Sequence, residues 1–280
     1  MNNTILLATD CSEYSEGAVR EAINMAKSCD SRLYVMSVAE INPEFMALAP
    51  LAIEEIEKTI RGYLEKIMGK AAQENVECEI IIREGEGPHS FIIEEAAKKQ
   101  ADLIVMGRRG RTGLSRVIMG SETARVIGHT SCKVLVVPRC SSIKWKSIII
   151  ATDGSKYSEA AARESIKMAK KCTGLPGQAS TCSLLALAVI PEYATEEETK
   201  TVTNAVREIK QNAEKENLKA ETSIQKGKPS EIIVKFAKEK NADIIVMGSH
   251  GRTGLQRLLM GSVTASVIGH TDRAVMVVKA

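Results

Sequence analysis

The segment Ala101-Asp-Leu-Ile-Val-Met-Gly107 decides the fold, because the chain repeats it later as Ala242-Asp-Ile-Ile-Val-Met-Gly248. At a shift of 141 residues, 101–137 aligns with 242–278, and 25 of these 37 positions are identical. A repeat of this length is far longer than a solenoid unit, so each copy is expected to bury a core of its own.

The repeat extends to the start of each half, where Ala8-Thr-Asp10 matches Ala151-Thr-Asp153 at a shift of 143. The chain has 280 residues, which suits two domains when one domain holds roughly 150 residues. We therefore predict two tandem domains, over residues 1–140 and 145–280. The second copy carries extra residues between its first helix and second strand, and residues 173–180 are interpreted as that insertion.

Short apolar runs alternate with helical patterns through the first copy. Such runs indicate strands that are buried on both faces, and they cover residues 5–8, 33–38, 103–106 and 134–137. Over residues 76–82 apolar side chains occupy every second position, which favours an edge strand with one wetter face instead. Strand–helix alternation gives right-handed crossovers and a parallel sheet. The predicted fold is α/β, with two tandem doubly wound domains that each hold a five-stranded parallel sheet of order 3-2-1-4-5, with helices on both faces.

Composition and charge exclude several classes of protein. The chain is 44% apolar and 3% aromatic, and 38 Lys and Arg against 35 Asp and Glu leave a net charge of +3. Few rings and little excess positive charge argue against a dedicated binder of single-stranded nucleic acid. No apolar run is long enough for a membrane span, and the start of the chain lacks the features of a signal peptide. Seven Cys without a Cys-x-x-Cys pattern favour a reduced, cytoplasmic protein without a metal site.

The glycine-rich segment of each copy follows a buried strand and precedes a helix. It runs from Gly107 to Ser121 in the first copy and from Gly248 to Ser262 in the second, with four glycines at the same spacing. Glycines let the backbone turn tightly and bring N–H groups close to a ligand, and a helix N-terminus favours an anion. Neither the Walker A ending nor the dinucleotide fingerprint is present. We interpret the segment as a polyphosphate cradle; the alternative is a structural loop that ends in a helix cap.

A carboxylate follows the first strand of each copy, at Asp10 and Asp153. In a doubly wound sheet, ligands bind beyond the carboxyl ends of the strands where the winding reverses, commonly between the first and fourth strands. Asp10 and Gly107 are therefore expected to face one crevice, where the carboxylate accepts hydrogen bonds from ribose hydroxyls. The alternative is that Asp10 only caps the helix that begins near Tyr14.

These motifs together resemble the ATP-binding branch of the universal stress proteins. The resemblance rests on the pattern Gly-x2-Gly-x9-Gly-Ser. In the first copy this pattern comes after Asp-Leu-Ile-Val-Met and before Val-Leu-Val-Val. Both copies also open on Thr-Asp-x-Ser, at residues 9–12 and 152–155, and the second copy has Gly-x-Pro at 227–229. The first copy departs slightly, with Gly-Glu-Gly-Pro at 85–88. The match spans nearly the whole chain as a tandem pair.

The resemblance implies a stress-response or regulatory protein that holds ATP, with or without Mg2+, at the carboxyl ends of each sheet. Asp10 and Asp153 would contact ribose, and backbone groups of Val38 and Val189 would contact adenine. The residues expected at the phosphates are Gly107, Arg109, Gly110, Gly120, Ser121 and Thr123 in the first copy and Gly248, Gly251, Gly261, Ser262 and Thr264 in the second. Glu122 and its counterpart Val263 are also expected at the nucleotide. A carboxylate next to a triphosphate is unfavourable, so that of Glu122 must point away from the phosphates or meet Mg2+.

The resemblance also implies that the two domains pair within the chain, and we expect the chains to form a homodimer. The composition and the apolar runs described above lead us to expect neither nucleic acid nor a membrane as partner. His129 and His270 lie at equivalent helix ends, where a helix cap is favoured over a catalytic base. Residues 196–198 are interpreted as the solvated first turn of a helix. No general base is evident, so we expect at most slow ATP hydrolysis. Two other classes stay open: an ATP-hydrolysing or nucleotidyl-transfer enzyme on the same fold, and a nucleotide-free module that binds a partner.

Overall fold

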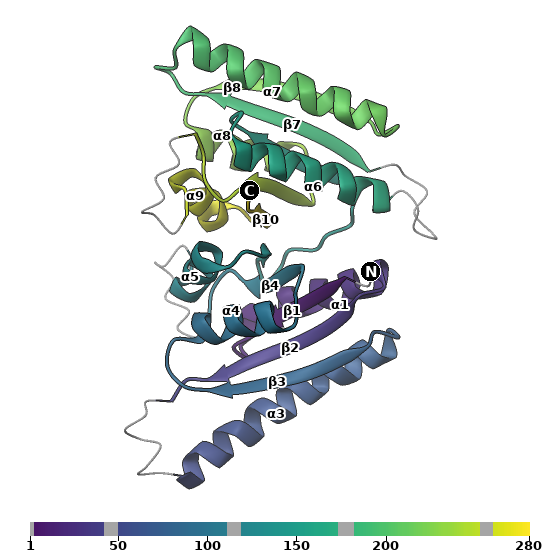
Figure 1. Cartoon of the computed structure of the whole chain (residues 1–280), viewed down its shortest axis with the longest axis vertical. Coiled ribbons are helices and arrows are strands. Elements are labelled where there is room, and N and C mark those ends of the chain that lie inside the picture. The colour runs from purple at the N-terminus through teal and green to yellow at the C-terminus, as the bar shows by residue number, and fades with distance from the viewer. Residues whose placement is uncertain (1–2, 42–49, 111–118, 173–181, 253–259) are drawn as a thin grey trace. The chain divides into compact units, whose positions relative to one another are not determined.

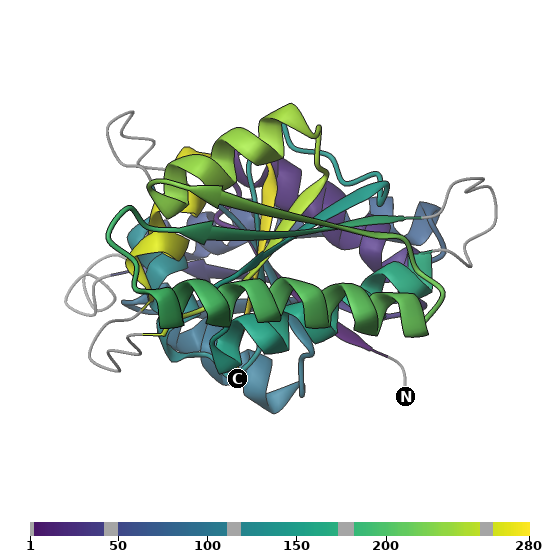
Figure 2. The same cartoon turned by 90° about the horizontal axis from the view of Figure 1, so that it is seen from above.

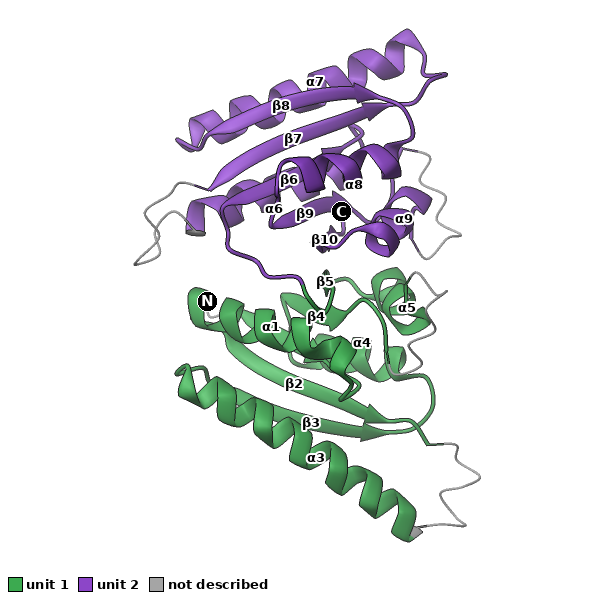
Figure 3. Cartoon of the chain, turned by 180° about the vertical axis from the view of Figure 1, so that it is seen from behind, with its two compact units in different colours: residues 1–140 green, residues 141–280 purple. Residues whose placement is uncertain are grey.

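The computed structural model describes residues 3–41, 50–110, 119–172, 182–252 and 260–280. The chain divides into two compact units, residues 1–140 and 141–280 (Figure 3). The predicted insertion at residues 173–180 lies outside the described residues. Over the described ranges, no helix combines the length and the apolar character that crossing a membrane requires.

Unit 1 alternates strands and helices along the chain (Figure 1). Its strands are β1 (Thr4–Ala8), β2 (Arg32–Ala39), β3 (Cys78–Glu84), β4 (Leu103–Gly107) and β5 (Lys133–Val137). Its helices are the short 3-10 helix η1 (Glu13–Ser15), α1 (Glu16–Cys29), α3 (Pro50–Gln73), α4 (Pro88–Lys98) and α5 (Ser121–His129). The strand order is β3-β2-β1-β4-β5, and each ladder in it is parallel. The predicted fold class and strand order are confirmed.

Unit 2 repeats this arrangement. Its strands are β6 (Ser147–Thr152), β7 (Ser183–Ile190), β8 (Ala220–Lys226), β9 (Ile244–Gly248) and β10 (Ala274–Val278). Its helices are α6 (Lys156–Cys172), α7 (Glu196–Lys215), α8 (Pro229–Glu239) and α9 (Ser262–His270). The order β8-β7-β6-β9-β10 corresponds strand for strand to that of unit 1, and these ladders are also parallel.

Helices cover both faces of each sheet, which explains why the central strands are apolar throughout. In unit 1, α1 packs against β1, β4 and β5, α3 packs against β2 and β3, and α4 contacts α5 and β2. In unit 2, α7 and α8 both contact β7 and lie on opposite faces of the sheet (Figure 2). Leu6, Ile104 and Leu135 of unit 1 and Ile149 and Val246 of unit 2 are fully buried.

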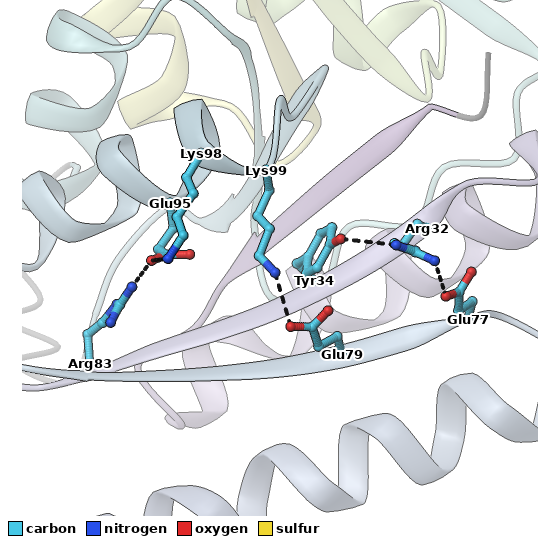
Figure 4. Close-up of polar contacts among 8 residues, drawn as sticks. All are labelled: Arg32, Tyr34, Glu77, Glu79, Arg83, Glu95, Lys98 and Lys99. Carbon is cyan, nitrogen blue, oxygen red and sulfur yellow. Dashed lines mark hydrogen bonds and ion pairs between the residues drawn. The ribbon is translucent and has the colours of Figure 1, made fainter.

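Strand β3 lies at the edge of the sheet, as predicted, and its residues are half-buried apart from the exposed Glu79, rather than alternately buried and exposed. Polar side chains join it to neighbouring elements (Figure 4). Arg83 of β3 forms an ion pair with the buried Glu95 of α4, and Lys98 Nζ lies 3.6 Å from the same carboxylate. Lys99 Nζ lies 3.0 Å from Glu79 Oε1. The outer part of this sheet is therefore held by charge pairs as well as by apolar packing.

The apolar stripe that predicts the long helix α3 is only partly buried. Ile60, Leu64 and Ile67 are buried, whereas Ile56 and Met68 are 43% and 36% exposed. A helix of 24 residues is about 36 Å long, which is longer than the seven-residue strand β3 that it covers. Ile56 therefore lies toward a helix end that outruns the strand, and Met68 lies about 100° around the helix from Ile67, at the margin of the stripe.

Candidate functional site

Two loops meet at the carboxyl edge of each sheet, one after the first strand and one after the fourth. In unit 2, a Cβ added to Gly251 would lie 2.7 Å from Asp153 Oδ2. In unit 1, a Cβ added to Gly110 would lie 3.2 Å from Asp10 Oδ2. The structure thus brings each predicted carboxylate against the glycine loop of its own unit.

The Thr-Asp-x-Ser motif builds the first of these loops. In unit 2, the Gly154 N–H donates to Thr152 Oγ1 (3.2 Å), and the Ser155 N–H donates to Asp153 Oδ1 (3.0 Å). The Arg252 N–H donates to Asp153 Oδ2 (2.9 Å), so this carboxylate links the two loops. Each carboxylate oxygen has two lone pairs, so a second donor such as a ribose hydroxyl can still bond to Asp153.

Unit 1 repeats these side-chain-to-backbone bonds. The Cys11 N–H donates to Thr9 Oγ1 (3.1 Å), and Asp10 Oδ1 accepts from Ser12 N (3.1 Å) and Ser12 Oγ (2.7 Å). Ser12 is the residue that precedes η1. Asp10 therefore shapes the turn that leads into the first helix, which is close to the capping alternative, while it also faces Gly110.

Close packing accounts for the glycine that ends the fourth strand. A Cβ on Gly248 would lie 2.6 Å from Tyr157 Cβ, and one on Gly107 would lie 3.1 Å from the Tyr14 carbonyl oxygen. These contacts let the start of the first long helix sit directly against the end of the fourth strand. A side chain at Gly248 would force the two elements apart.

The helix after the glycine loop begins with backbone N–H groups that have no acceptor among the described residues. Gly120 is the N-cap of α5 and carries no capping side chain, and the first bond within the helix runs from Ala124 N to Gly120 O (3.1 Å). Among the described residues, no acceptor meets the N–H groups of Ser121, Glu122 and Thr123. Three unpaired donors at the positive end of a helix favour an anion.

The start of α9 has the same geometry. Gly261 is its N-cap, and Ala265 N donates to Gly261 O (3.0 Å). The N–H groups of Ser262, Val263 and Thr264 have no acceptor within the described part of the chain. Ser121 and Ser262 are both exposed at the first helical position, where their hydroxyls are open to a ligand.

The side-chain hydroxyls of the threonines at the third helical position bond to the backbone at the start of the glycine loop. Thr123 Oγ1 donates to Gly107 O (3.1 Å), and Thr264 Oγ1 donates to Gly248 O (2.9 Å). Both side chains are buried. A phosphate oxygen accepts hydrogen bonds and each hydroxyl has a single proton, so these hydroxyls tie the helix to the end of the fourth strand, and only their backbone N–H groups face the position predicted for phosphate.

Glu122 points away from the cradle. Its Oε2 accepts from the backbone N–H (2.8 Å) and lies 2.9 Å from Nδ1 of His89, and its Oε1 accepts from Arg125 (2.8 Å). Burial of this carboxyl tends to raise its pKa, but the hydrogen bonds from His89 outweigh burial, and the pKa of Glu122 is lowered. The N-cap of α4 is Gly87, which has no side chain, so Glu122 takes the place of a capping residue at the start of α4.

The remaining predicted residues lie near the ends of their strands. Val38 and Val189 occupy the next-to-last positions of β2 and β7, beyond the last residues that pair with β1 and β6, which are Met36 and Ala188. Arg109 is half-buried in the glycine loop of unit 1, and its Nε is buried without a hydrogen-bond partner among the described residues. Residues 111–118 and 253–259 of the two loops lie outside the described ranges.

The sequence-based predictions missed three features of the sites. His89, which positions Glu122, is 33 residues away from it, so no local pattern relates them. Arg252 forms an ion pair with Glu198 of α7 (3.2 Å). Thr195 and Glu198 form a capping box at the start of α7, and the Thr-x-x-Glu spacing could have predicted that bond.

His129 and His270 lie at helix ends as expected of helix caps. The Nδ1 atom of each ring lies within hydrogen-bond distance of a carbonyl oxygen one turn back in its helix (2.9 and 2.7 Å).

Comparison with known proteins decides the family. A sequence model of the universal stress protein family matches residues 1–138 and again residues 144–279. The chain belongs to the universal stress protein family. Both units are therefore universal stress protein domains, and the chain is a tandem pair of them.

Relatives within the universal stress protein family match one unit or both. A universal stress protein of Mycolicibacterium smegmatis is 27% identical over 304 residues, covering 98% of this chain and 96% of its own. One from Methanocaldococcus jannaschii is 38% identical over 140 residues, covering 48% of this chain and 81% of its own. The crystal structure of a universal stress protein from Archaeoglobus fulgidus covers 99% of this chain and 96% of its own, with a TM-score of 0.78 at 23% identity, and so shares the fold.

Proposed function

We propose that each unit binds one ATP at the carboxyl edge of its sheet and that the chain acts as a nucleotide-responsive regulatory protein. One observation carries this proposal. Helices α5 and α9 begin with a glycine N-cap and three N–H groups that have no acceptor among the described residues. The same arrangement stands beside a carboxylate in both units, as a nucleotide with its phosphates on the helix and its ribose on Asp10 or Asp153 would require.

The residues present fit the charge of a polyphosphate. The Glu122 carboxylate, which would repel phosphate, is turned onto His89. Arg109 offers a buried Nε without a described partner in unit 1, and Arg252 lies within the glycine loop of unit 2, directly after Gly251. Any Mg2+ at the site would be held through the phosphates of the bound nucleotide.

Substitution of one serine in each unit tests the proposal. An Asp at the first position of a helix interacts favourably with the helix dipole, by about 0.3–1 kcal/mol, so Ser121→Asp and Ser262→Asp should fold. Each added carboxylate would occupy the donors that a phosphate needs and repel it. We expect each variant to lose ATP binding in its own unit by tenfold or more in isothermal titration calorimetry, with adenosine affected less.

A matched control is Thr222→Asp, which adds the same charge at an exposed position of the edge strand β8. It should leave ATP affinity unchanged. Equal losses of ATP affinity for Thr222→Asp and Ser262→Asp would show that only net charge matters and would contradict the cradle.

Analysis of the nucleotide products over hours distinguishes the proposed function from the enzyme alternative. The proposal predicts at most slow release of ADP and no AMP. Light scattering tests the expected homodimer against the chain mass of 30.4 kDa.

A further inference from the structure

Arg252 contacts two elements at the carboxyl edge of unit 2. Its backbone N–H donates to Asp153 Oδ2 (2.9 Å), and its guanidinium Nη2 lies 3.2 Å from Glu198 Oε1 in the first turn of α7. The residue before it, Gly251, has its nitrogen 3.7 Å from the Cβ position of Gly261, the N-cap of α9. The side chain of Arg252 thus starts beside the proposed phosphate position and ends on a different element.

Glu198 is shared between that ion pair and the start of its own helix. Its Oε2 accepts from the Thr195 N–H (2.9 Å), and its own N–H donates to Thr195 Oγ1 (3.2 Å), which makes a capping box. Its Oε1 pairs with Arg252. One carboxylate oxygen therefore caps α7, while the other holds the arginine.

The first turns of α7 also pack onto the loop that carries Asp153. Gly154 has φ +77°, and a Cβ there would lie 2.8 Å from Thr201 Cγ2. The start of α7 is consequently anchored to the site by two contacts, one apolar at Gly154 and one ionic at Arg252. Loss of the ionic contact would therefore increase the mobility of the first turns of α7.

Exposure of the pair makes it exchangeable. The side chains of Arg252 and Glu198 are 31% and 42% exposed, and ion pairs at that exposure contribute little to stability. A triphosphate carries several negative charges and accepts two parallel hydrogen bonds from a guanidinium. It would compete effectively with a single carboxylate for Arg252.

We propose that the Glu198–Arg252 pair is a charge latch on the nucleotide site of unit 2. In the free protein Glu198 holds Arg252; when a triphosphate binds, Arg252 transfers to it and the start of α7 loses its ionic anchor. The latch rests on the proposed ATP binding and adds to it a preference for the triphosphate over adenosine and a structural response at α7. The counterpart of Arg252 in unit 1, Arg111, lies outside the described residues, so the latch is assigned to unit 2.

The test measures ATP and adenosine affinity by calorimetry in a Ser121→Asp background, which leaves unit 2 as the binding site. Glu198→Gln keeps an oxygen for the capping box and removes the charge that competes for Arg252. We expect it to tighten ATP binding about two- to fivefold and to leave adenosine binding unchanged. The matched control, Glu197→Gln, removes the same charge one residue away and should change neither affinity by that amount. Arg252→Gln should weaken ATP but not adenosine.

Hydrogen exchange supplies a second readout. Addition of ATP should speed amide exchange over residues 196–201 in the protein with Glu198 and produce no such change in Glu198→Gln, whose thermal unfolding checks that α7 is intact. ATP binding that is unchanged or weakened by Glu198→Gln, or an equal effect on adenosine, would overturn the latch while leaving the proposed function standing. Absence of ATP binding in the Ser121→Asp background would overturn both.

Discussion

Asp153 lies directly against Gly251: a Cβ on the glycine would stand 2.7 Å from Asp153 Oδ2, and the next N–H along the chain donates to that same oxygen at 2.9 Å. The Asp153 carboxylate and the glycine loop are therefore packed tightly against each other and joined by a hydrogen bond. The space between them has no room for a side chain. Substitution at this glycine consequently tests how the site is built.

Gly251→Ala should destabilise unit 2, because the added methyl group would push Asp153 out of its bond to Arg252. A loss of about 0.5–1.5 kcal/mol in the free energy of unfolding is expected, the net contribution of a typical hydrogen bond within a protein. Gly69→Ala is the control: nothing lies within 4 Å of a Cβ at this exposed helical position, so it should stabilise α3 by roughly 0.5–1 kcal/mol. Urea denaturation measures both, and a neutral Gly251→Ala would contradict the packing described.

Cys11 and Gly154 occupy equivalent positions after the first and sixth strands, both with left-handed backbone (φ +61° and +77°). A non-glycine residue is strained there, at about 1–2 kcal/mol. Cys11→Gly removes that strain, and the described contact of its Sγ with Ser37 Oγ is long at 3.6 Å, so the thermal midpoint of unfolding should rise. Gly154→Ala should lower the midpoint, because its methyl group would meet Thr201. Shifts in the same direction would show that backbone conformation is not the cause.

Glu122 stabilises the start of α4 only while it is ionised. Its pKa in the folded protein is lowered from its ordinary value of 4.5, so its contribution is complete above about pH 4.5 and is lost as the pH falls through the folded-state pKa. Glu122→Gln keeps an oxygen for the His89 N–H but removes the charge, so it should lower stability at pH 7 by roughly 0.3–1 kcal/mol, the range for a charge at a helix N-terminus. It should also make stability less dependent on pH below about pH 4.5. ATP affinity should not change, because the carboxylate faces His89; a marked gain in affinity would place it at the phosphates instead.

The buried Glu95 of unit 1 has an apolar counterpart in Phe236 of unit 2, at a shift of 141. Its partner Arg83 corresponds to Gln225, from the register of the two edge strands. Arg83→Gln alone should destabilise unit 1, because the ion pair left to Glu95 among the described residues would be that with Lys98, at 3.6 Å. Leaving a buried carboxylate underpaired costs on the order of 1–2 kcal/mol. The double variant Arg83→Gln/Glu95→Phe should recover most of that loss in urea denaturation. A double variant no more stable than Arg83→Gln would mean that the neighbouring side chains cannot accept the ring.

The sequence predicts those features that depend on local pattern. Apolar runs such as 103–106 identify the buried strands, and the repeat identifies two domains, because both signals come from residues adjacent in the chain. The contacts that orient the site come from residues far apart: His89 with Glu122, and Glu198 with Arg252. Side chains on different elements meet only after the sheet is assembled, so spacing alone cannot relate them. The exposure of Ile56 has the same origin, since it depends on where α3 outruns the strand that it covers.

The number of ATP molecules bound per chain tests the central claim most directly. Equilibrium dialysis of the whole protein against labelled ATP with Mg2+ should give two sites per chain, one site in either Ser121→Asp or Ser262→Asp, and none in the double variant. Thermal unfolding would show that all four proteins are folded. No binding by the unsubstituted protein at millimolar ATP, or two sites retained in the double variant, would contradict the account.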